Sequence, residues 1–154
     1  MRLSVLILMA AGLSACSEST RCAPTSPCTA LRSTADSLAG SWKEVQTWGG
    51  LSIQMSLAAR DTTLAGSGTY SVAGGPAGTA HVSGFVFWQD SGFVPSGHVV
   101  PAHPVFVLDL TFSNGTSAVF DQGTIQQQNT LSGVMTFSDD ESTSYGTTFA
   151  RASP

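Results

Sequence analysis

The sequence predicts an all-β domain, an antiparallel up-and-down barrel of about eight strands, with a β-sandwich as the alternative. From residue 51 onward, apolar and polar residues alternate with the period of a half-buried strand in one segment after another. Short turns separate these segments, and no long amphipathic helix interrupts them. Charged residues make up only 10% of the 154 residues, which is typical of an extracytoplasmic sheet protein rather than a disordered chain.

The alternation assigns one face of each predicted strand to the interior. The inner residues are predicted to be Leu51, Ile53, Met55, Leu57, Leu64, Tyr70, Val72, Phe106, Leu108, Leu110, Phe112, Ala118, Phe120, Leu131, Met135, Phe137, Tyr145, Thr147 and Phe149. The segment 80–88 differs because it is apolar on both faces, so it is expected either to be buried on both faces or to meet a loop or a partner with its second face. Residues 89–103 contain Gly and Pro throughout and are predicted to be the longest irregular connection of the domain.

Asn114-Gly115 lies between two alternating segments and predicts a tight hairpin. A type I′ turn needs positive φ at both central residues, and Asn-Gly is the pair that adopts it most readily. We therefore expect a two-residue turn joining strands near 105–113 and 116–122, with Phe112 and Thr116 paired across it.

A weak internal repeat favours the barrel over the sandwich. The segments 64–70 and 131–137 share the pattern Leu-x-Gly-x-x-Thr-aromatic, and similar strand starts suit a meander better than a Greek key. Gly40-Ser41-Trp42 at the first strand is similar to the Gly-x-Trp motif of lipocalins, so the domain resembles the calycin group of small barrels. This resemblance implies that Trp42 plugs the closed end of the barrel and that Arg151, at the end of the last strand, stacks on it.

The N-terminus has the layout of a secretory signal. Met1-Arg2 is followed by an apolar run that ends in Leu13-Ser14-Ala15-Cys16, and this segment resembles the lipobox of bacterial lipoproteins. The resemblance implies that Cys16 receives a diacylglycerol, that cleavage occurs just before it, and that the membrane is a partner through this anchor. The organisation expected is a signal peptide at 1–15, a lipidated cysteine and flexible tether at 16–37, and a barrel at 38–152.

The location expected is therefore the cell envelope. Ser17 stands where an Asp signals retention in the inner membrane of some bacteria, so the outer membrane is favoured. No later segment approaches the about 20 apolar residues that a membrane-spanning helix requires. With Cys16 acylated, Cys22 and Cys28 remain for a disulfide, although the prolines between them leave open whether the two Cβ atoms can approach. A short helix over 29–39 is the alternative to a tether at its C-terminal part.

No residue pattern predicts an enzyme or a cofactor. Gly-x-Ser-x-Gly and His-Glu-x-x-His motifs are absent, and no catalytic residue is assigned. His98, His103 and Asp90 lack the spacing of a metal site and are expected at the surface, so no metal is predicted. The net charge of −4 and the lack of a Lys/Arg cluster exclude nucleic acid as a partner.

The function predicted is non-enzymatic binding of a small, mostly apolar ligand inside the barrel. The predicted lining is Trp42, Glu44, Leu51, Met55, Tyr70, Leu108 and Phe120. The alternative is a filled barrel with a structural or protein-interaction role. Glu44 shares strand parity with Trp42, so if Trp42 points into the barrel Glu44 does too. An inward carboxylate would be paired with Arg151 or belong to a polar ligand site. The alternative is that the strand twists or bulges so that Val45 faces inward instead.

Overall fold

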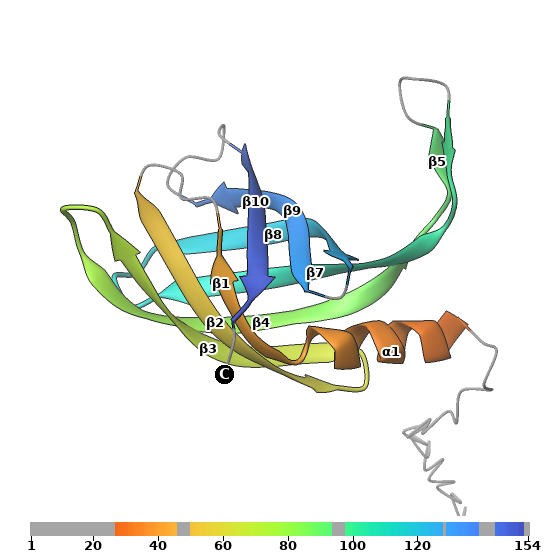
Figure 1. Ribbon diagram of the computed structural model, residues 1–154, viewed down its shortest axis with the longest axis horizontal. Coiled ribbons are helices and arrows are strands. Elements are labelled where there is room, and N and C mark those ends of the chain that lie inside the picture. The colour runs from red at the N-terminus through yellow and green to blue at the C-terminus, as the bar shows by residue number, and fades with distance from the viewer. Residues whose placement is uncertain (1–26, 46–49, 94–97, 128, 139–143, 153–154) are drawn as a thin grey trace, which may run out of the picture.

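The computed structural model describes residues 27–45, 50–93, 98–127, 129–138 and 144–152, and it shows a closed antiparallel barrel of eight strands (Figure 1). The barrel strands are β1 (Gly40–Glu44), β2 (Leu51–Arg60), β3 (Thr63–Val72), β4 (Ala77–Gln89), β7 (His103–Phe112), β8 (Ser117–Gln126), β9 (Thr130–Phe137) and β10 (Ser144–Arg151). Each strand pairs with the next barrel strand along the chain, and β1 pairs with β10 to close the circle. The predicted up-and-down barrel is confirmed, and the sandwich is not formed.

A helix, the alternative to a tether over 29–39, covers one end of the barrel. α1 (Pro27–Leu38) starts with a proline, which suits the first helical turn, and its Leu31, Ala35 and Leu38 fall on one side at helical spacing. Ala35 and Leu38 have no exposed surface and belong to the barrel core. Residues 27–37, which the predicted organisation assigned to the tether, thus include side chains that pack in the barrel core. We call this end, where β1 starts and β10 ends, the closed end.

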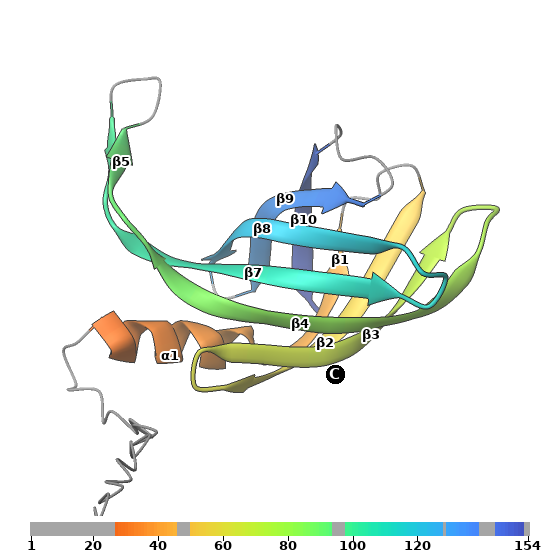
Figure 2. The ribbon, with the colours of Figure 1, turned by 180° about the vertical axis from the view of Figure 1, so that it is seen from behind.

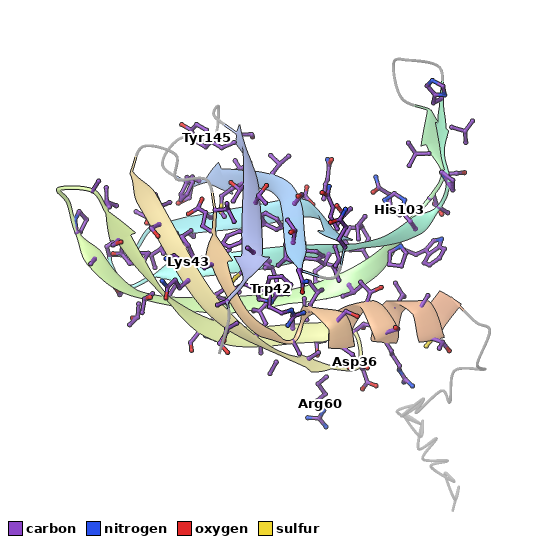
Figure 3. All side chains as sticks on the ribbon, viewed as in Figure 1. Asp36, Trp42, Lys43, Arg60, His103 and Tyr145 are labelled. Carbon is purple, nitrogen blue, oxygen red and sulfur yellow. The ribbon has the colours of Figure 1, made fainter. Side chains whose placement is uncertain are left out.

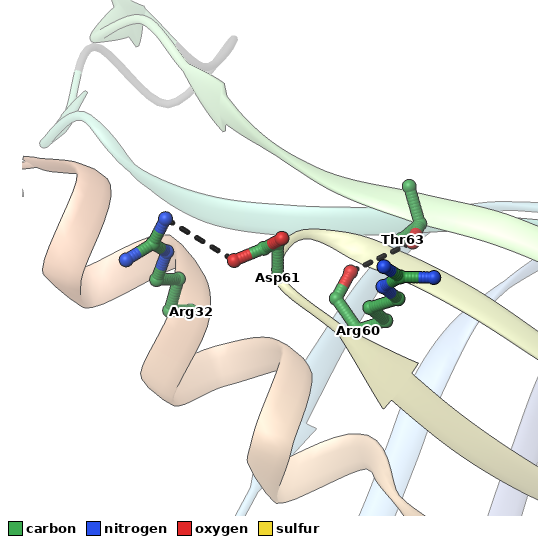
Figure 4. Close-up of polar contacts among 4 residues, drawn as sticks. All are labelled: Arg32, Arg60, Asp61 and Thr63. Atoms are coloured by element: carbon green, nitrogen blue, oxygen red, sulfur yellow. Dashed lines mark hydrogen bonds and ion pairs between the residues drawn. The ribbon is translucent and has the colours of Figure 1, made fainter. Parts of the chain in front are cut away.

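An ion pair also connects α1 to the turn between β2 and β3. Figure 4 shows Arg32 reaching Asp61, with Nη2 and Oδ1 3.1 Å apart. Both side chains are well exposed, so the pair contributes less than about 1 kcal/mol to stability.

The connection between β4 and β7 is more ordered than the sequence suggested. Their pairing continues to Gln89 and His103, and β5 (Gly92–Phe93) then pairs with β6 (Val99–Val100) in a separate two-stranded sheet. The prediction of an irregular connection over 89–103 was therefore wrong for the described residues. We call the paired ends of β4 and β7, together with β5 and β6, the ribbon. Figures 1 and 2 show the ribbon leaving the barrel on the side where α1 begins.

The Asn114-Gly115 hairpin is present, but its turn differs from the predicted type. The N–H of Phe112 donates to the Thr116 carbonyl, as expected for a pair across the turn. Gly115 has φ 91° and its N–H donates to the Phe112 carbonyl, while Asn114 is not among the positive-φ residues. This is a three-residue loop with a left-handed glycine at its end. Asn114 instead accepts hydrogen bonds from the N–H and hydroxyl of Thr116 through Oδ1.

Replacing Gly115 with Val is expected to lower the free energy of unfolding by about 1–2 kcal/mol, because a β-branched residue is strained at this φ. A Cβ at this position would meet nothing within 4 Å, so the effect comes from the backbone alone. Urea denaturation measures it. Gly92→Val is the matched control, since Gly92 is equally open and lacks a positive φ; equal losses in the two variants would contradict the explanation.

Candidate functional site

The closed end is held by a contact between the first and last strands. Trp42 and Arg151 are register partners, and the Arg151 Cζ lies 4.3 Å from the centroid of the Trp42 ring. Arg151 also donates to α1 and its exit, from Nη2 to the Ser37 carbonyl at 2.7 Å and from Nη1 to the Ala39 carbonyl at 2.9 Å. The Trp42 Nε1–H donates to the Leu38 carbonyl at 2.8 Å. In Figure 3 Trp42 lies where α1 meets the barrel.

This arrangement confirms the predicted meeting of Trp42 and Arg151. A guanidinium over an indole contributes about 0.5–2 kcal/mol, and the carbonyls at the helix C-terminus obtain donors that they would otherwise lack. Both side chains therefore contribute their contacts to the closure of the barrel.

Gly40 makes this closure possible. Its φ is 127°, and a Cβ there would lie 2.5 Å from Nη1 of Arg151. Any other residue would be strained and would displace the guanidinium. In the Gly-x-Trp motif, Gly40 therefore leaves room for the Arg151 guanidinium because it has no side chain. Trp42, two residues later on the same strand, supplies the ring on which that guanidinium lies.

The interior that was predicted to hold a ligand is filled by side chains. Leu108 and Phe120 have no exposed surface, Met55 is 3% exposed and Tyr70 is 6% exposed, while Leu51 is half-buried. A water-sized void would itself expose the side chains around it, so none borders Leu108 or Phe120.

Aromatic rings contact one another in two groups inside the barrel. The ring centroids are 5.6 Å apart for Phe106 and Phe120 and 5.5 Å apart for Phe120 and Phe149. Tyr70 meets Phe112 edge-on with centroids 4.9 Å apart. These distances are those of favourable aromatic pairs and leave no gap between the rings.

Two glycines, Gly123 and Gly133, do not open a cavity, because neighbouring rings take their space. A Cβ on Gly123 would lie 2.5 Å from the Phe106 ring, and one on Gly133 would lie 2.7 Å from the Phe120 ring. Each ring thus packs directly on the backbone of the next strand.

Glu44 faces the interior. Its side chain is 6% exposed, whereas Val45 is 59% exposed, so the alternative of a bulge that turns Val45 inward is wrong. Backbone pairing of β1 with β2 ends at Lys43 and Gln54, and Glu44 Oε2 accepts the next N–H, that of Ile53, at 3.2 Å. Burial raises the pKa of the Glu44 carboxyl from 4.5 to about 7, and the Ile53 hydrogen bond opposes part of the rise.

Arg151 does not neutralise this carboxyl, since its guanidinium lies over Trp42 and donates to carbonyls. Thr147, 3% exposed, is the other buried polar side chain among the described residues and shares the inner face with Phe149, the register partner of Glu44. Glu44 and Thr147 therefore form the polar part of an otherwise apolar interior.

The histidine, acidic and cysteine side chains discussed above form no metal site among the described residues. Among the described residues no three His, Cys, Asp or Glu side chains come together in a group that could hold a metal ion. His103 Nδ1 lies 2.8 Å from the Pro101 carbonyl oxygen, at the base of the projecting ribbon (Figure 3). Cys28 is disulfide-bonded. Its predicted partner Cys22, like Cys16, lies outside the described residues, so that pairing stays a prediction.

A shallow depression on the outer face of β1–β4 was not anticipated. It holds about 420 Å³ and is open to solvent. Its exposed lining consists of hydroxyl and amide side chains: Ser41, Gln54, Ser56, Ser67, Thr69 and Thr79. On β2 and β3 these polar residues alternate with the core residues. That alternation is the feature of the sequence from which a polar outer face could have been predicted. The polar surface of the barrel is thus outside rather than inside.

These features define a closed eight-stranded antiparallel barrel that is lipocalin-like in layout, with a plugged end and a filled interior. No helix in the described part of the chain combines the length and apolar character needed to cross a membrane. A scan against protein-family models and a search of curated proteins both find no match.

Proposed function

We propose that this protein is a non-enzymatic, lipid-anchored lipoprotein of the cell envelope whose filled barrel acts through its outer surface, in a structural or protein-interaction role. The packed interior is the observation that supports this role. Phe106, Phe120 and Phe149 have no exposed surface and occupy the space that a ligand would need. A barrel of eight strands has room for its own side chains or for one small ligand, and here the side chains take it.

The apolar ligand is the second candidate. The observation that favours it is the inward Glu44 carboxyl with Thr147 on the same inner face, since sites for mostly apolar ligands carry a few polar groups that fix the ligand's orientation. Such a ligand would have to displace aromatic side chains to reach Glu44.

The anchor rests on Leu13-Ser14-Ala15-Cys16 and the apolar run before it. A single acyl chain holds a protein marginally, whereas the diacylglycerol and amide-linked chain of a processed lipoprotein give stable attachment. The outer membrane is the proposed location because Ser17 follows the cysteine.

Cys16→Ala is expected to abolish acylation and to leave the protein uncleaved or soluble. Labelling of growing cells with radioactive palmitate, followed by membrane fractionation, measures both effects. Cys22→Ala is the matched control and should keep the label. A cleaved Cys16→Ala form that stays with the membrane would remove the anchor from the proposal.

A further inference from the structure

The ribbon formed by the ends of β4 and β7 stands apart from the barrel. The last bond that ties β4 to the neighbouring side runs from the Val86 N–H to the Thr62 carbonyl at 2.8 Å. Beyond it, β4 pairs only with β7, and β5 and β6 continue the ribbon through the Gly92–Val100 and Phe93–Val99 pairs. An isolated two-stranded ribbon is only marginally stable in water, so this one needs further contacts.

Exposed apolar side chains lie along the ribbon and at its base, although Val86 (3% exposed) and Val105 (2% exposed) are buried there. Phe85, which still pairs with Thr63 of β3 at the base of the ribbon, is 46% exposed, whereas Trp88 is 38% exposed and Val99 57%. The Phe85 and Phe87 rings lie 5.6 Å apart on one face, and Trp88, one residue further along β4, belongs to the other. Both faces thus carry aromatic side chains, as the two-sided pattern of 80–88 indicated. A flat protein partner would cover one face, whereas a surrounding apolar medium covers both.

The scarcity of charged residues in the ribbon indicates which kind of lipid surface it could contact. Asp90 is the only Asp, Glu, Lys or Arg between residues 85 and 108. A surface that adheres to anionic lipid electrostatically would carry clustered Lys or Arg, and this one does not. Trp favours the boundary between lipid headgroups and acyl chains, where its aromatic body and its polar N–H are both accommodated, and the apolar Phe ring can be buried beside it.

The ribbon and the start of α1 lie at the same end of the molecule. β4 runs toward the closed end, where α1 packs, and Figures 1 and 2 both show the start of α1 and the ribbon on one side. Cys16 precedes Pro27 by 11 positions, which span at most about 40 Å when fully extended. A bilayer that holds Cys16 is therefore within reach of the ribbon.

From this juxtaposition we infer that the ribbon is a second membrane contact, which inserts Phe85, Trp88 and Val99 into the headgroup boundary of a zwitterionic bilayer. The inference rests on the proposed anchoring for its orientation. It fixes the closed end toward the membrane and presents the hydroxyl-lined outer face of β1–β4 to the envelope.

Trp88 itself reports the insertion. The purified mature protein is placed in phosphatidylcholine vesicles with brominated acyl chains, in a Trp48→Phe background that leaves Trp42 and Trp88. Trp42 has no exposed surface inside the barrel, so bromolipid quenching is expected from Trp88 alone and should disappear in Trp88→Phe. Quenching should persist at high salt, because no charge contact drives it.

A matched pair of variants separates the ribbon from exposed apolar residues in general. Phe85→Ser should lower the quenching of Trp88. Val45→Ser should not, although Val45 is 59% exposed, because it lies toward the opposite end of β1. Unquenched Trp88 overturns the inference, and so does a dimer that Phe85→Ser dissociates, since the ribbon would then bind a second copy. If Cys16 proves not to be acylated, the same protein added to preformed vesicles still tests the ribbon.

Discussion

Replacing Trp42 with alanine is expected to lower the free energy of unfolding by about 3–5 kcal/mol, the range for a large aromatic residue removed from a core. Trp42 has no exposed surface, carries the Arg151 guanidinium and donates to the Leu38 carbonyl. The variant loses all three contributions and leaves the cation without its aromatic partner. Urea denaturation followed by circular dichroism measures the loss.

Two further variants show whether the closure is responsible. Arg151→Leu should cost about 1–3 kcal/mol, because it leaves the Ser37 and Ala39 carbonyls without their donors. Val45→Ala, at an exposed position beside β1, should change stability by less than about 0.5 kcal/mol. A Trp42→Ala loss no larger than that of Val45→Ala would contradict the closure of the barrel through Trp42.

Glu44→Gln is expected to stabilise the protein at pH 8 by about 2–3 kcal/mol and to change little at pH 4. The pKa of the Glu44 carboxyl is raised from 4.5 to about 7 by burial. Below pH 4.5 the carboxyl is protonated in both the folded and the unfolded chain, so its contribution to stability is fully present. Between pH 4.5 and 7 the unfolded chain ionises first, and stability falls as pH rises. A tenfold change in an acid dissociation constant corresponds to about 1.4 kcal/mol.

The amide of glutamine keeps an oxygen for the Ile53 N–H but does not titrate, so the pH dependence between 4.5 and 7 should flatten. Urea denaturation at pH 4, 6 and 8 follows this. Asp109→Asn is the control, since Asp109 is an exposed carboxylate on the outer face of β7. Parallel pH profiles for the native protein and Glu44→Gln would show that Glu44 is not buried as a neutral acid.

Alternation alone predicted most of the barrel. It placed Ile53, Met55 and Leu57 of β2 and Leu108 and Leu110 of β7 on the inner face, and all of them are buried. Such a pattern is decisive because a shift of one residue would expose the whole set. The Trp42–Arg151 contact followed from the family resemblance and from the positions of the two residues at the two ends of the domain.

Features that depend on several strands at once could not be predicted. Periodicity does not tell whether the Phe120 ring covers the backbone of Gly133, so a filled interior and a cavity were both compatible with the sequence. The sequence left open whether 29–39 is a tether or a helix, because short amphipathic segments such as α1 gain most of their stability from packing rather than propensity. The facing of Glu44 depended on whether β1 bulged, which its five residues do not indicate.

Native mass spectrometry of the protein extracted from its own membrane tests the central claim, an acylated anchor on a filled barrel, most directly. The Phe85→Ser variant is measured beside the native chain, so that lipid bound to the ribbon is not mistaken for a ligand in the barrel. The predicted result is the mass of the chain from Cys16 plus its acyl groups, with no further molecule released on collision. An unacylated mass, or an apolar molecule bound one-to-one in both proteins, would contradict this claim.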